Sequence, residues 1–156
     1  YNGKIKRSSI VTFGLKELVS IENEYLYSLF GKKISEDNLE DYVKFCGDQL
    51  NLYFMCIKEV FNEKYGKEIW GNYRKTGCML MSVSSIVAFI KLYKYFIIEN
   101  LTTNKDIEEI KKYLKKIKVN FENDKYKYTS SQWTKLEEKM LKEIRVNSRN
   151  FGKKKK

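Results

Sequence analysis

None of the 156 residues is proline, so no position forces a break in an α-helix. Between residues 39 and 61, apolar residues recur every three or four positions, which is the spacing of one face of a helix. Apolar residues make up 42% of the chain, enough to bury a core, and the length suits one domain. The sequence therefore predicts a mostly α-helical domain, a compact bundle of four to five helices.

The longest predicted helix begins at Ser35 and ends at Gly66. Ser35 is a capping residue, two acids follow it, and glycine is a common helix stop. Gly47, inside this helix, weakens it and predicts close packing of a neighbour. Three further helices are predicted at 78–99, at 103–118 and after residue 130.

The N-terminal segment 4–13 leaves two interpretations open. It is prone to form a short strand, but Leu15, Leu18 and Val19 continue it at helical spacing. Residues 1–152 are expected to form one helical domain, and 153–156 a disordered basic tail. Because the chain starts at Tyr1 rather than Met, we expect it to be the C-terminal part of a longer protein.

The chain has few residues able to perform catalysis or bind metal. It contains no histidine, and its cysteines, Cys46, Cys56 and Cys78, lack the spacing of a zinc site. Their apolar surroundings predict buried free thiols, as in a reducing cytoplasm. Paired carboxylates fall on polar helix faces, so we expect no enzyme, no metal and no cofactor. The longest uncharged piece of the apolar 78–98 stretch has 13 residues, too short to span a membrane.

Positive charge is concentrated in the last third of the chain. Residues 1–101 carry a net charge of +2, and residues 102–156 carry +9. Such an imbalance favours a polyanionic partner, DNA or RNA, contacted mainly at its phosphates. An AT-biased genome, which enriches Lys, Ile, Asn and Tyr, would give part of the same charge, and glutamates at helical spacing would neutralise part of it.

The candidate nucleic-acid-binding residues lie on the last two helices and on the loop between them. Tyr126 and Tyr128 are the candidates for stacking on bases, since lysines surround both. The full set is Lys111, Lys112, Lys115, Lys116, Lys125, Tyr126, Lys127, Tyr128, Lys135, Lys139, Lys142, Arg145 and Arg149.

A second function remains open. The aromatic-rich region 42–98 holds more apolar surface than one small core needs, which favours a protein-interaction or oligomerisation domain without nucleic-acid contact. An acidic membrane surface is a weaker third partner for the basic tail.

Three groups of residues together resemble one family. Residues 5–10 and 15–18 form the first group, and residues 128–133 with Leu136 form the third. The second group consists of residues 69–70, 77–82 and 86–90. In this order they resemble the C-terminal part of proteins with the Asp-Gly-Gln-His-Arg domain, which include the DndB-type regulators of bacterial DNA phosphorothioation.

The resemblance implies a bacterial protein of DNA modification or phage defence. Such proteins have a ParB-like α/β core followed by helices, and the DndB members resemble DNA-binding repressors. The signature Asp-Gly-Gln-His-Arg motif is absent from this chain, which would correspond to the region downstream of it. No signature residue can therefore be assigned here.

Overall fold

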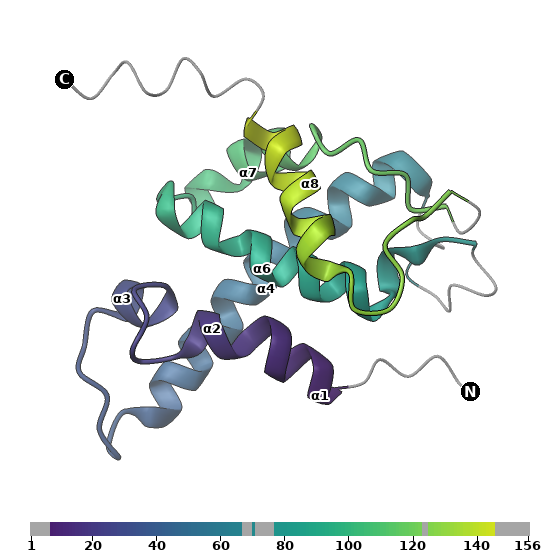
Figure 1. Ribbon diagram of the computed structural model, residues 1–156. Helices are drawn as coiled ribbons and strands as arrows, with labels where there is room; N and C mark the ends of the chain where they lie inside the picture. Colours follow the sequence, from purple (N-terminus) through teal and green to yellow (C-terminus); the bar gives the residue numbers. More distant parts are fainter. Residues whose placement is uncertain (1–6, 67–69, 71–76, 123–124, 146–156) are drawn as a thin grey trace.

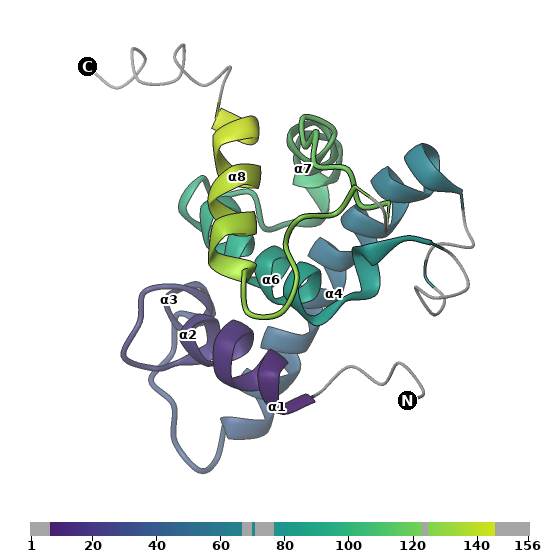
Figure 2. The ribbon, with the colours of Figure 1, turned by 45° about the vertical axis from the view of Figure 1, so that its right-hand side comes forward.

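In the computed structural model, helix α6 (Val83–Ile98) lies at the centre, between α4 (Leu39–Tyr65) and α8 (Trp133–Arg145) (Figures 1 and 2). The structure describes residues 7–66, 70, 77–122 and 125–145. Helix α6 carries no charge from Val83 to Ile90, which explains why it can be buried on most sides. The mostly α-helical fold that the sequence predicts is confirmed.

Aromatic side chains pack α4 against α6. The rings of Tyr53 and Tyr93 stack at 4.4 Å, and the Tyr53 hydroxyl donates a hydrogen bond of 2.7 Å to the Phe89 carbonyl. Phe61 meets Phe89 edge to face at 5.5 Å. The hydroxyl of the buried Tyr53 thus has a hydrogen-bond partner, as stable burial of a polar group requires.

The N-terminal segment is helical wherever the structure describes it, so the alternative of a short strand is wrong for residues 7–13. It forms α1 (Arg7–Ser9), a π-helical turn η1 (Ile10–Leu15) and α2 (Lys16–Val19). A Cβ on Gly14 would lie 3.2 Å from Ile90, so the glycine permits close packing on α6. This packing favours the helix, whose periodicity places Leu18 in the core. Residues 4–6 lie outside the described part.

Helix α4 begins later than predicted. Asn38 is its N-cap, and the Asn38 side chain accepts a hydrogen bond of 2.8 Å from the Ser35 N–H, which holds a turn before the helix. The predicted stop at Gly66 is confirmed, with φ of 87°. A short helix that the sequence does not predict, α3 (Leu26–Phe30), precedes α4.

Two short helical segments precede α7 and α6. A 3₁₀ turn, η4 (Asn104–Asp106), leads into α7 (Ile107–Leu114), and Thr103 and Asp106 form a capping box there. Helix α7 ends at Leu114, earlier than the predicted Lys118. The turn η3 (Met79–Met81) precedes α6, and its Met79 N–H donates to the Phe121 carbonyl at 2.6 Å. This bond joins the start of α6 to the chain between α7 and α8.

Candidate nucleic-acid interface

The lysines of α7 lie among carboxylates. Lys111 is held by Glu59 of α4 and by Glu108, whose oxygen is 3.4 Å from the Lys111 Nζ, and its side chain is only 18% exposed. One turn later, the Lys115 Nζ lies 3.1 Å from a Glu63 oxygen, also on α4. The acids of α4 therefore compensate most of the charge of the largely buried Lys111 and part of the charge of the exposed Lys115.

The other two lysines of this group also have local partners. Lys112 lies 3.9 Å from Glu109, and the Lys116 Nζ lies 4.6 Å from the centre of the Tyr113 ring. A cation over a ring face is attracted by the ring quadrupole. The Lys112 side chain is exposed to solvent, whereas the Lys111 side chain is largely buried.

Helix α8 presents a different surface. Leu136, Met140 and Ile144 face inward and have no exposed area. The helical repeat therefore turns another set of residues, spaced four and then three positions along the chain, toward solvent. Those outward residues are Lys135, Lys139 and Lys142, and all three are exposed. Only Lys139 of the three forms an ion pair with a described residue, Glu143 at 3.6 Å, and the Lys139 side chain stays 53% exposed. We call these three residues the α8 lysine stripe.

Arg145 ends α8 beside a buried tyrosine. Its guanidinium lies 5.6 Å from the centre of the Tyr95 ring. Burial, with Tyr113 nearby, raises the pKa of Tyr95 to about 12. The remaining candidate of this group, Arg149, lies outside the described residues.

The loop between α7 and α8 places its two tyrosines differently. The Tyr126 ring is 7% exposed, and its hydroxyl lies 2.7 Å from the Ser84 hydroxyl and 2.8 Å from the Ser85 hydroxyl. Tyr126 thus fastens the loop to the first turn of α6 and offers no face to a base, contrary to its assignment as a stacking residue. Tyr128 is half-buried and remains a candidate.

The two lysines of this loop are both exposed. The Lys125 Nζ lies 3.4 Å from a Glu122 oxygen, and Lys127 makes no ion pair with any residue that the structure describes. The predicted residues in the described part of the chain thus lie on α7, on the loop and on α8, and several of their charges have acidic partners there.

The net charge of +11 is distributed unevenly between the described residues and the remainder. The described residues contain 21 Lys and Arg and 18 Asp and Glu, a net charge of +3. The other residues, which include Arg149 and Lys153–Lys156, carry the larger share in the sequence. Any contact of the described residues with a polyanion therefore depends on where their lysines lie, and not on a large total charge.

A charged cluster under α8 has no counterpart in the sequence analysis. The Lys94 Nζ lies 3.1 Å from a Glu17 oxygen and 3.8 Å from Glu137, and Lys91 lies 3.9 Å from Glu137. Burial raises the pKa of Glu137, although the two lysines oppose the shift. The cluster joins α2, α6 and α8, three segments with no shared local pattern, so no signal in the sequence points to it.

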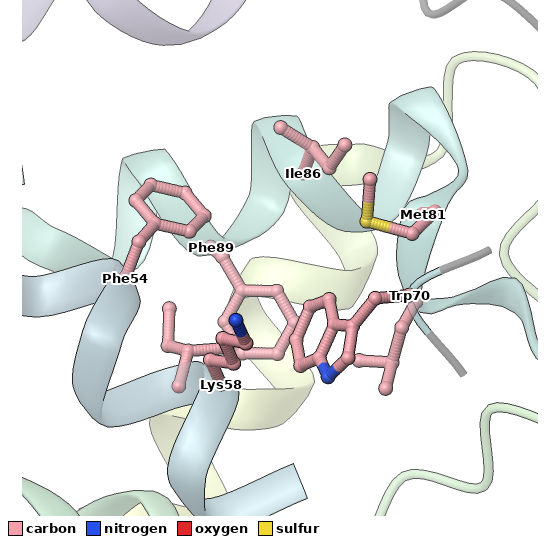
Figure 3. Close-up of a pocket in the computed structure, with 8 residues that line it drawn as sticks. Phe54, Lys58, Trp70, Met81, Ile86 and Phe89 are labelled. Atoms are coloured by element: carbon pink, nitrogen blue, oxygen red, sulfur yellow. The ribbon is translucent and has the colours of Figure 1, made fainter. Parts of the chain in front are cut away.

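An apolar cavity of about 270 Å³ lies between α4 and the start of α6 (Figure 3). Phe54, Trp70, Met81 and Phe89 are among its lining residues, and the Trp70 indole donates a hydrogen bond to the Asn62 side chain. The side chain of Lys58 reaches over the cavity (Figure 3). It forms no ion pair within the described part of the chain.

No protein-family model matches this sequence, and no curated protein or solved structure matches it either. The link to the Asp-Gly-Gln-His-Arg family therefore stays a prediction. Within the described residues, no three histidine, cysteine or acidic side chains are grouped as metal ligands, and no helix has the length and apolarity needed to cross a bilayer.

Proposed function

We propose that this chain binds nucleic acid through phosphate contacts made by the outward face of α8. The observation that carries the proposal is the α8 lysine stripe, in which Lys135 and Lys142 have no acidic partner among the described residues. Over seven residues the stripe rises by about 10 Å, a length comparable to about three base-pair steps of a duplex. Lysine contacts of this kind carry no sequence information.

Further candidate residues lie close to α8 in the sequence. Lys127 and Tyr128 lie on the loop that leads into α8, and the sequence continues beyond α8 with Arg149 and four terminal lysines. Bacterial DNA modification or phage defence, the context that the resemblance implies, is part of the proposal. DNA is the first ligand to test, with RNA as a competitor.

The test is a salt series with a labelled DNA duplex, measured by fluorescence anisotropy. In the chain tested, Lys153 to Lys156 are each changed to Ser, so that the terminal charges cannot dominate. Three to four phosphate contacts predict that log K falls with log salt with a slope of about −3 to −4. A slope near zero, or binding that disappears with the terminal lysines, would contradict the assignment to α8.

A further inference from the structure

One face of α4 is apolar and open to solvent along its first half. Leu39 and Val43 are 50% and 64% exposed. Gly47, Leu50 and Phe54 follow on the same face, each three or four residues further along. A Cβ on Gly47 would meet nothing within 4 Å, so the neighbour that the sequence predicts at this glycine is not supplied by the described part of the chain.

This face leads into the apolar cavity. Phe54 belongs to both, and Lys58 follows one turn later at the cavity (Figure 3). Leu39 lies eight residues before Gly47, and the Phe54–Lys58 stretch lies seven to eleven residues after it. At the helical rise, these separations are about 12 Å and about 10–16 Å. The exposed leucine and the cavity are therefore at matching distances on opposite sides of the glycine.

We propose that two copies of this chain associate through α4, antiparallel and crossing at Gly47, with Leu39 of each copy entering the cavity of the other. A two-fold contact requires a surface that is complementary to itself. The α4 face meets this requirement, because an exposed apolar side chain and an apolar cavity lie at matching distances from its centre. A glycine at the crossing lets the two backbones approach closely.

The charges along α4 fit the same arrangement. Glu36 and Asp37 are exposed in the turn before α4, Glu40 is exposed in its first turn, and Lys58 is exposed at the cavity. Antiparallel packing brings the acidic start of each copy next to Lys58 of the other. Since the contact is two-fold, each such attraction occurs twice.

The cavity and Lys58 alone would also suit a small anionic amphiphile. Such a ligand leaves the exposure of Leu39 and Val43 and the open space at Gly47 unexplained, whereas a second copy accounts for all three. This association uses no residue of the α8 lysine stripe, so it can be tested separately from nucleic-acid binding.

The experiment is sedimentation velocity of the full chain over a wide range of concentration. We expect a concentration-dependent dimer. Gly47→Leu and Lys58→Glu should each raise its dissociation constant roughly tenfold or more, because each change enters the interface twice. Gly47→Leu points into open space in a single copy, so its circular dichroism should stay that of a folded helical protein.

A charge exchange supplies the specific test. Combining Lys58→Glu with Glu36→Lys and Asp37→Lys in one chain should restore the dimer, while Lys105→Glu on η4 serves as the control and should have no effect. A wild-type chain that remains monomeric, or a dimer unchanged by Gly47→Leu, would overturn the proposal. The proposal would also be overturned if anilinonaphthalene sulfonate bound to a monomer and quenched the fluorescence of Trp70, measured in a Trp133→Phe background. The cavity would then hold a small ligand.

Discussion

Helices α7 and α8 are similar in sequence, both amphipathic and both rich in lysine, but the structure gives their lysines different surroundings. Beside α7 stands α4, whose Glu59 and Glu63 contact Lys111 and Lys115. Among the described residues, no acidic side chain of another helix pairs with the α8 lysine stripe, and its one ion pair joins Lys139 to Glu143 of the same helix. The comparison shows that a count of lysines measures charge, while the neighbouring helix decides how much of that charge remains for a partner.

The largest expected effect on duplex binding comes from neutralising the lysines of α8 and comparing the result with neutralised lysines of α7. Changing Lys135, Lys139 and Lys142 to Gln should weaken duplex binding roughly 100-fold near 0.1 M salt, and the salt slope should become shallower by about 3. The matched triple variant Lys112→Gln, Lys115→Gln and Lys116→Gln should lose much less. Fluorescence anisotropy on one duplex measures both, and equal losses would show that the partners of these lysines, Glu109, Glu63 and Tyr113, do not reduce their contribution to binding.

A smaller effect is expected when the acidic partners of α7 are removed. The double change Glu59→Gln and Glu63→Gln frees Lys111 and Lys115, so duplex binding should tighten by roughly tenfold and the salt slope should steepen by up to about 2. The control is Glu22→Gln together with Glu24→Gln, two exposed positions that form no ion pair in the described part. If both doubles tighten binding equally, general charge and not α7 is responsible.

The smallest effect concerns the inner side of α8. Burial raises the pKa of Glu137, so between the ordinary glutamate pKa of about 4.3 and its value in the fold, the folded chain keeps a proton that the unfolded chain has lost. The contribution of this group to the free energy of unfolding therefore decreases as pH rises through that interval. Glu137→Gln should abolish the decrease and raise stability at neutral pH by less than about 1 kcal/mol.

Urea unfolding of the wild type and of Glu137→Gln, at a series of pH values, measures this difference. Glu138→Gln, on the exposed side of the same helix, is the matched control. A variant that is clearly less stable than the wild type at neutral pH would show that attraction to Lys91 and Lys94 outweighs the cost of burying Glu137.

Local patterns in the sequence predict the helices whose signals are themselves local. The uncharged run from Val83 to Ile90 predicts the buried α6, and Gly66 predicts the end of α4. Helix α4 starts at Leu39 and not near Ser35, because the Asn38 side chain accepts a hydrogen bond from the Ser35 N–H and holds a turn there. For residues 7–13, packing of Gly14 against Ile90 decides between strand and helix, and that contact joins residues 76 positions apart.

The candidate site shows the same limit. Pairs within one helix, such as Lys139 with Glu143, follow from spacing. The contact of Lys111 with Glu59 joins residues 52 positions apart in the sequence and depends on how α7 packs on α4. Tyr126 has lysines on both sides in the sequence, but the Ser84 and Ser85 hydroxyls draw it into the core. The spacing of residues along the chain predicts neither the Lys111–Glu59 contact nor the burial of Tyr126.

The three buried cysteines can serve as internal probes of local opening. Cys46 lies in the first half of α4, Cys56 in the second half and Cys78 beside the chain that follows α7, and burial raises the pKa of each thiol. Because alkylating reagents need an accessible thiolate, each cysteine reacts only when its surroundings open. The labelling rate of each cysteine would therefore report how often the structure around it opens.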